Sequence, residues 1–133
     1  MAVLAQAGIG MVVNLYTKTP AHHPGAHPSS YFAGSARSVM WAISHGAAAL
    51  AIHATLGLVV VVLALVVALS AARGSNRALK FWLILAAGLV IGAGFNGASF
   101  LDFNQNISSL VMALLALGSV VCYAIALFLL SVT

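Results

Sequence analysis

Five histidines are the residues of this sequence whose type and spacing best suit ligand or metal chemistry, and they form two groups. His22, His23 and His27 lie in the stretch HHPGAHP, whereas His45 and His53 lie in SHGAAALAIHATLGL. A neutral imidazole nitrogen is a common ligand of zinc, copper and haem iron. The first group therefore predicts a metal site in a proline-rich connection, and the second predicts a cofactor or packing site on a helix.

The first group can converge on one copper or zinc ion if the proline turns bring its imidazoles together. His45, which follows the same connection, is the candidate fourth ligand. The alternative is adventitious binding, because exposed histidines take up such ions readily and a functional site needs ordered groups around its ligands.

His53 lies in an apolar run, about 12 Å beyond His45 if one helix with a rise of 1.5 Å per residue carries both. An ionisable side chain inside a membrane is costly, which predicts a functional site, although a neutral histidine can instead hydrogen-bond a neighbouring helix. Ala49 and Gly57, one turn on either side, leave room for a flat haem ring or for another helix. We therefore expect haem or a packed helix at the face formed by Ala49, His53 and Gly57.

His45 and His53 are not expected to ligate the same iron, because eight residues along a helix rotate their side chains by about 80°. A second axial ligand would come from Met11, from Met112 or from a histidine of a second copy. Otherwise one coordination position of the haem stays open.

The composition of the chain is that of a membrane protein. It has 133 residues, of which 63% are hydrophobic and only 5% charged, and Asp102 is its single acidic residue. Soluble domains carry about 25% charged residues, so this composition predicts an integral membrane protein. The five lysines and arginines lie near the ends of apolar runs, where they act as topology signals. We infer a lipid bilayer, and no nucleic acid, as the partner of these basic groups.

Four apolar segments have the length of membrane spans. A helix needs roughly 20 apolar residues to cross a hydrocarbon layer about 30 Å thick. Continuous apolar runs favour helices over a barrel. The segments lie at about 2–17, 46–71, 79–100 and 107–130. We predict a single all-α transmembrane domain over 1–133, an up-down-up-down four-helix bundle in the cytoplasmic membrane.

Residues 18–45 are expected to form the outer connection. The three prolines in 18–36 predict an irregular loop, and Trp41 with its apolar neighbours predicts a short interfacial helix after that loop. More basic residues lie between the second and third spans than in this connection, which places both termini in the cytoplasm. They are Arg73, Arg77 and Lys80, against Lys18 and Arg37.

Three spans carry stripes in which small and polar residues recur at every fourth position. The stripes are Gln6, Gly10 and Asn14; Ala49, His53 and Gly57; and Gly88, Gly92 and Asn96. We expect these faces to meet in the bundle, with the three amides hydrogen-bonded between helices. The alternative is a small polar cavity for a quinone, a haem propionate or a transported solute.

Asp102 is expected outside the spans. Its neighbours DFNQNIS indicate a loop followed by a helix start, with Asn106 or Ser108 as the capping residue. The carboxylate would then lie near the positive end of the last helix.

Two stretches, LAQAGIGMVVNLY and SHGAAALAIHATLGLVVVVLAL, resemble helices of four-helix membrane haem proteins. The chain looks most like one half of the heme A synthase family, which has a Q…G first helix and a later helix reading H…H…LG into aliphatic residues. This resemblance covers about half of the chain and implies a haem, as haem b, on His53 and also involving His45. The chain has no second histidine-bearing span and no membrane glutamate, so synthase activity is not implied.

Three functions are expected from these features. The first is a haem-binding electron-transfer or redox-accessory protein, with His53 as axial ligand and His45 as second ligand or polar contact. The second is a non-enzymatic structural or regulatory subunit of a larger membrane complex, with the histidines hydrogen-bonded between helices. The third is a small transporter or metal-handling protein that uses the outer histidines. No nucleophile and base arrangement supports a hydrolase, and the chain is expected not to be an enzyme. A bundle this small is expected to form a homo-oligomer or to join a larger assembly.

Overall fold

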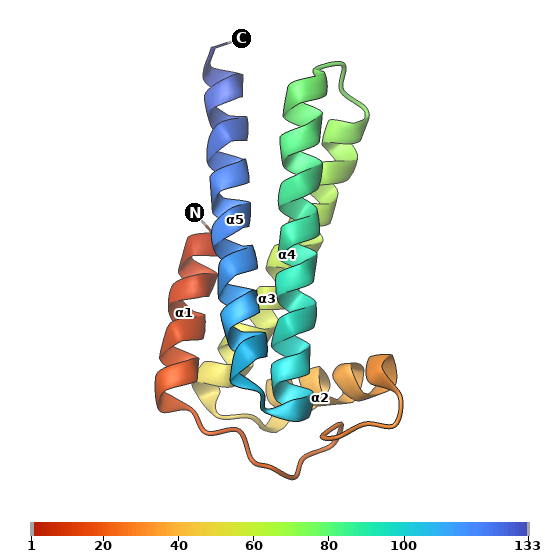
Figure 1. The fold of residues 1–133 in the computed structure, drawn as a ribbon, viewed down its shortest axis with the longest axis vertical. Coiled ribbons are helices and arrows are strands. Elements are labelled where there is room, and N and C mark those ends of the chain that lie inside the picture. The colour runs from red at the N-terminus through yellow and green to blue at the C-terminus, as the bar shows by residue number, and fades with distance from the viewer. Residues whose placement is uncertain (1, 133) are drawn as a thin grey trace.

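The computed structural model describes residues 2–132, and within that range the chain forms five helices and no strand (Figure 1). The all-α prediction is therefore confirmed for the described chain. The helices are α1 (Ala2–Tyr16), α2 (Tyr31–His45), α3 (Ala48–Ala72), α4 (Arg77–Phe103) and α5 (Asn106–Ser131).

Three of these helices are long and apolar enough to cross a membrane. The helices α3, α4 and α5 have 25, 27 and 26 residues, which corresponds to about 38–40 Å at 1.5 Å per residue and exceeds a hydrocarbon layer of about 30 Å. The helix α1 is apolar but has only 15 residues, or about 22 Å. Length and composition thus indicate a helical membrane protein.

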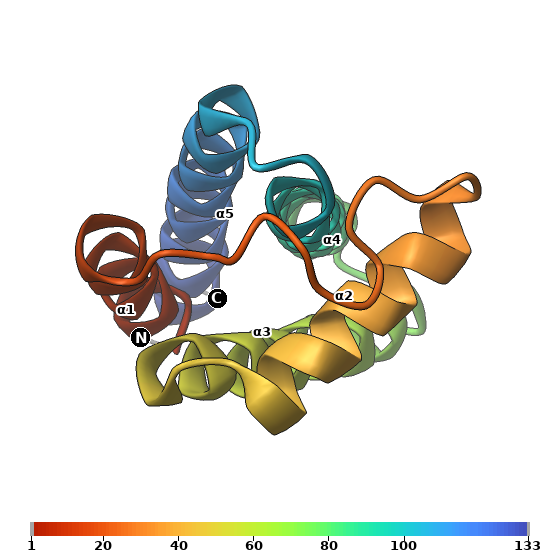
Figure 2. The ribbon, with the colours of Figure 1, turned by 90° about the horizontal axis from the view of Figure 1, so that it is seen from below.

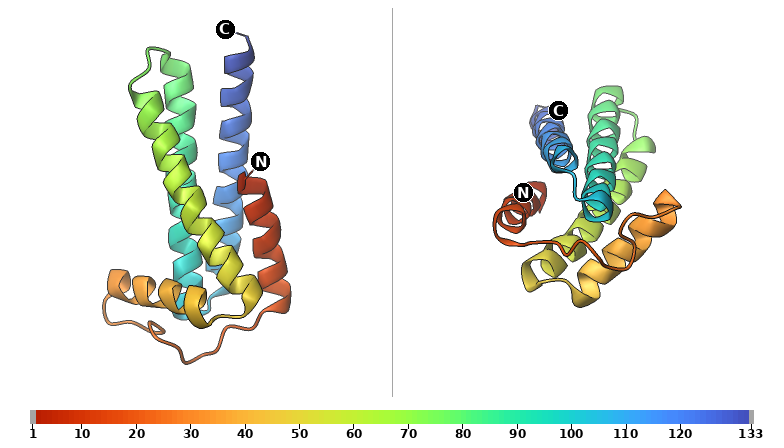
Figure 3. Two further views of the ribbon diagram at one scale, coloured as in Figure 1. Left: turned by 180° about the vertical axis from the view of Figure 1, so that it is seen from behind. Right: turned by 60° about the horizontal axis from the view of Figure 1, so that its bottom comes forward.

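The helices α1, α3, α4 and α5 lie roughly along one axis and alternate in direction (Figures 1 and 3). The helix α4 contacts both α3 and α5, and α1 contacts the same two helices from the other side. In the described chain no Cα atom of α3 lies within 8 Å of a Cα atom of α5. The helix α1 lies beside the lower part of α5, and the described N-terminal residues are near the middle of the bundle (Figure 1).

The helix α2 lies across one end of the bundle, under the ends of α3 and α4 (Figures 1 and 2). Its buried face consists of the small residues Gly34, Ser35, Ser38 and Ala42, which allow close approach to the other elements. The helix is longer than expected, because the loop prediction for 18–36 is wrong over its last six residues, which are helical. Tertiary packing of the small face outweighs the loop-like composition of this segment.

The ends of α4 are set by two asparagines. The side chain of Asn76 accepts a hydrogen bond from the backbone N–H of Leu79 at 3.0 Å, as an N-cap does. At the other end Asn104 has a φ of 51°, and its N–H donates to the carbonyl of Phe100 at 2.8 Å. The helix therefore extends past the expected segment 79–100, and Asp102 belongs to its last turn.

Candidate functional site

The imidazole of His53 lies between α1 and α3 and is bound by one side chain of α1. Nε2 of Gln6 donates to Nδ1 of His53 at 3.0 Å and to the backbone carbonyl of His53 at 2.7 Å. The contact with the carbonyl identifies the atom of Gln6 as its amide nitrogen, because two carbonyl oxygens would repel at this distance. A single amide therefore holds both the ring and the backbone of His53.

This hydrogen bond determines where the proton of a neutral His53 lies. Since Nδ1 accepts from Gln6, the proton of the neutral ring is on Nε2. A metal-ligating histidine has the opposite arrangement: the ring nitrogen that does not bind the metal donates its proton to an acceptor, and the nitrogen that binds the metal keeps its lone pair. As placed, His53 does not fit the role of a haem ligand through Nε2.

Two glycines, Gly10 of α1 and Gly57 of α3, lie where the two helices approach each other closely around His53. A Cβ added at Gly10 would lie 2.8 Å from Cε1 of His53, and one added at Gly57 would lie 3.1 Å from Nε2 of Gln6. Real Cβ atoms are not found as close to a ring as the first distance, so Gly10 is the residue that lets α1 lie against the imidazole. The face of α3 around His53 was expected to meet either haem or another helix, and in the structure it meets the helix α1.

Comparisons with protein-family models, with curated proteins and with solved structures find no match. The resemblance to the heme A synthase family stays a prediction. The chemistry of the His53 site therefore has to be inferred from the geometry of its own residues.

His45 and His53 lie on different helices, because α2 ends at His45 and α3 begins at Ala48. The helical rise and rotation expected between the two histidines therefore do not apply. His45 is exposed, and its Nδ1 lies 2.7 Å from Oγ of Ser44, whose own proton is donated to the carbonyl of Met40 at 2.7 Å. Nδ1 of His45 is consequently the donor to Ser44, so Nε2 of the neutral ring has no proton and can accept a hydrogen bond.

The other expected members of the His53 site lie elsewhere. Asn14 accepts a hydrogen bond from Ser109 of α5 at 3.3 Å, and Asn96 donates to the carbonyl of Gly92 in its own helix at 2.9 Å. Ala49 packs at the edge of a buried cluster formed by Val13, Ala42, Leu50 and Leu101. Of the three amides, only Gln6 contacts the histidine.

The two methionines considered as second axial ligands also have other surroundings. Met11 is 66% exposed on α1. Met112 of α5 packs against α4, where a Cβ added at Gly97 would lie 3.1 Å from its sulfur.

Asp102 is buried at the end of the bundle that α2 covers, so the loop prediction for this residue is wrong. Its side chain is 1% exposed, and Oδ2 accepts a hydrogen bond from Oγ of Ser35 at 2.7 Å. Its backbone carbonyl accepts from the N–H of His27 at 2.9 Å. The residue before α5 is Gln105, and no side chain caps this helix, so the expected cap by Asn106 or Ser108 is absent.

The segment 17–30, which we call the strap, connects α1 to α2 and runs beneath the bundle (Figures 1 and 2). The ring of His23 stacks on Trp41 of α2, with centroids 4.4 Å apart, and its Nε2 donates to the carbonyl of Leu101 at 3.0 Å. His27 contacts Phe103 edge to face at 6.3 Å between centroids. These two histidines therefore join the strap to α2 and to the end of α4.

The structure does not bring the strap histidines together as a metal centre. Among residues 2–132 no group of three or more histidine, cysteine, aspartate or glutamate side chains is placed to hold a metal ion. His22 and His27 are exposed, and Nε2 of His23 carries the proton that it donates to Leu101.

Sequence reasoning missed the contact of Ser35 with Asp102. The available signal was the spacing of small residues at 34, 35, 38 and 42, which marks one face of a helix.

Proposed function

We propose that this chain is a non-enzymatic structural or regulatory subunit of a larger membrane complex. The observation that carries the proposal is the clamp between Gln6 and His53, in which the one histidine of α3 is used to attach α1. Interhelical hydrogen bonds of this kind are worth about 1 kcal/mol each in a membrane, and their role is to choose which helix faces meet. Two of the polar residues that suggested a cofactor, Gln6 and His53, thus join one helix to another.

The arrangement of the helices supports the same proposal. In the described chain no Cα atom of α3 lies within 8 Å of a Cα atom of α5, whereas α1 contacts both helices. Because α1 is shorter than α5 by 11 residues, with 15 against 26, it covers only part of their length. Large apolar side chains are exposed along both long helices, among them Val62, Leu63, Val66, Leu117, Val121 and Leu127. Such faces bind lipid or the helices of a partner.

Absorption spectroscopy tests this proposal against the haem interpretation. We expect protein purified gently from its native membrane to show no Soret band and no change in the visible spectrum on addition of dithionite. We also expect it to migrate in blue native electrophoresis at several times the mass of the 13.6 kDa chain. Polar contacts of His53 with α1 explain the first result, and the exposed apolar faces explain the second.

Two outcomes would contradict the subunit proposal. One is a Soret band that shifts on reduction and is lost in His53→Ala but kept in His45→Ala, which would establish haem on His53. The other is a colourless protein that migrates as a single chain under all mild detergent conditions.

We also propose that α1 is the first of four membrane spans, with both termini on the cytoplasmic side of the cytoplasmic membrane. The loop between α3 and α4, with Arg73 and nearby Arg77, lies at the same end of the bundle as the described end of α5 (Figure 1). Basic residues are retained on the cytoplasmic side. The strap and α2 lie at the opposite end. A helix of about 22 Å can cross if it stands upright and the bilayer thins locally.

Reporter fusions check this orientation. Green fluorescent protein joined to the C-terminus is expected to fluoresce, whereas alkaline phosphatase at the same position is expected to be inactive. Alkaline phosphatase inserted in the strap after Thr19 is expected to be active. The reverse pattern at either position would overturn the proposed orientation.

A further inference from the structure

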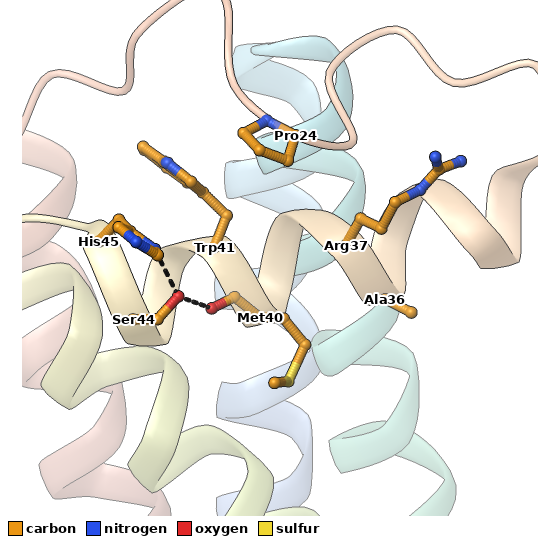
Figure 4. Close-up of a pocket in the computed structure, with 7 residues that line it drawn as sticks. All are labelled: Pro24, Ala36, Arg37, Met40, Trp41, Ser44 and His45. Atoms are coloured by element: carbon orange, nitrogen blue, oxygen red, sulfur yellow. Dashed lines mark hydrogen bonds between the residues drawn. The ribbon is translucent and has the colours of Figure 1, made fainter.

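An open cavity of about 610 Å³ lies along α2 and is bordered on one side by the strap (Figure 4). Six residues of α2 and one of the strap form its walls. They are Ala36, Arg37, Met40, Trp41, Ser44 and His45, with Pro24. The cavity lies at the end of the span helices and combines a cationic group with an apolar surface.

The guanidinium of Arg37 is available for an anion. Its Nε donates to the carbonyl of Ala33 at 3.1 Å, which holds the side chain along α2, and its terminal nitrogens have no partner within residues 2–132. The only acidic side chain, Asp102, is 1% exposed and bound to Ser35, so no carboxylate of the chain competes for Arg37. A guanidinium matches a phosphate because two N–H groups can bind two oxygens at once.

The same cavity offers an apolar surface on the side facing the bundle. Figure 4 shows the side chain of Met40 on the opposite side of α2 from Pro24 and the strap, whereas Arg37 extends toward the strap. Met40 is 64% exposed, and Phe32, near the start of α2, is 72% exposed. With α3, α4 and α5 as membrane spans, the bundle side of α2 would face the hydrocarbon layer and its strap side the headgroups, because α2 crosses the ends of these helices.

We propose that this cavity binds one anionic phospholipid, with its phosphate on Arg37 and the start of an acyl chain along Met40. The pairing of a free guanidinium with an exposed thioether and the ring of Trp41 selects a lipid over a free phosphate ion. Tryptophan at this depth is typical of membrane interfaces. His45 lies at the other end of the cavity, where its Nε2 accepts a hydrogen bond from a headgroup hydroxyl. This binding site is independent of whether the chain is a subunit of a complex.

Native mass spectrometry of the full chain tests the site. The protein is exchanged into detergent with equal amounts of phosphatidylglycerol and phosphatidylcholine that carry identical acyl chains. We expect the first lipid to be retained about tenfold more than the second. Both lipids carry the phosphate, but the second also carries a trimethylammonium group, which Arg37 repels and which cannot donate a hydrogen bond to His45. Arg37→Gln is expected to abolish this preference. Lys18→Gln, which removes an exposed charge from the strap outside the cavity, is expected to keep it.

Three results would overturn the proposal. They are equal retention of the two lipids by the unmodified chain, an equal loss of preference in Lys18→Gln and Arg37→Gln, and displacement of the bound lipid by a modest excess of inorganic phosphate. The second result would mean attraction by net charge alone, and the third would mean that a free anion is the ligand. Circular dichroism of Arg37→Gln with unchanged helicity verifies that a lost preference does not come from unfolding.

Discussion

Replacing Gly25 by alanine is expected to detach the strap from α2 and to destabilise the fold by about 2–3 kcal/mol, because two costs combine. Gly25 has a φ of 100°, a conformation that alanine rarely adopts. An added Cβ would also lie 2.6 Å from the backbone nitrogen of Ser38 and still closer to Oγ of the same residue. If the backbone of α2 moved away to make room for the added Cβ, Ser35 would lose its hydrogen bond to Asp102.

Thermal unfolding in detergent and limited proteolysis measure this effect. Gly25→Ala is expected to melt at a lower temperature and to be cut within the strap under conditions that leave the unmodified chain intact. Gly88→Ala is the matched control, since a Cβ added at Gly88 meets no atom within 4 Å. That control is expected to leave stability unchanged or to raise it by up to about 1 kcal/mol, the usual gain of alanine over glycine in a helix. Equal behaviour of the two variants would show that the strap contact has no part in stability.

Replacing Gly10 by leucine is expected to separate α1 from α3 and to cost about 3 kcal/mol through overpacking and a lost hydrogen bond. The first carbon of the new side chain would already lie 2.8 Å from Cε1 of His53. The ring would have to leave the amide of Gln6, and the donors and acceptors of both groups would then be unpaired. Hydrogen exchange of the α1 amides is expected to rise more than that of α4.

The control for this variant lies on the same helix. Gly8 has open space around its added Cβ, so Gly8→Leu is expected to change neither the melting temperature nor the exchange of α1. If Gly8→Leu and Gly10→Leu unfold alike, leucine on α1 rather than contact with His53 is the cause. A double-mutant cycle of Gln6→Ala and His53→Ala is expected to give a coupling of about 1 kcal/mol.

The long helices could be predicted from the sequence because the thickness of a membrane fixes their length. The expected segments 46–71 and 107–130 differ from α3 and α5 by at most two residues at each end. The C-terminal end of α4 was placed less well, because the helix ends at Phe103 rather than at residue 100. Its C-terminal extension depends on the cover that α2 and the strap provide, and this cover comes from a distant part of the chain.

The His53 site could be predicted in part. The recurrence of small and polar residues at every fourth position correctly indicated that Gln6 and Gly10 would meet the face of His53. The same pattern did not assign partners to Asn14 or Asn96. Asn96 satisfies its amide within its own helix, an option that residue spacing does not reveal. Small rotations of a helix decide between these partners.

The burial of Asp102 could not be predicted from neighbouring residues. Its hydroxyl partner, Ser35, is 67 positions away, and the strap, which precedes α2, reaches Asp102 through the left-handed conformations of Gly25 and His27. Loop paths of this kind depend on a few backbone angles rather than on hydrophobic periodicity. The small face of α2 was the only local sign that something would be covered.

The contacts under the bundle have a consequence for the order of assembly. Ser35 and His23 bind residues that are synthesised 67 and 78 positions later, at the end of α4. During translation at about 5–20 residues per second, the strap and α2 therefore emerge several seconds before their binding site exists. Over that interval Ser35 and His23 lack their partners at the end of α4. Closure of the strap is thus a late step of biogenesis, and chains interrupted before Phe103 reach the membrane with this end open.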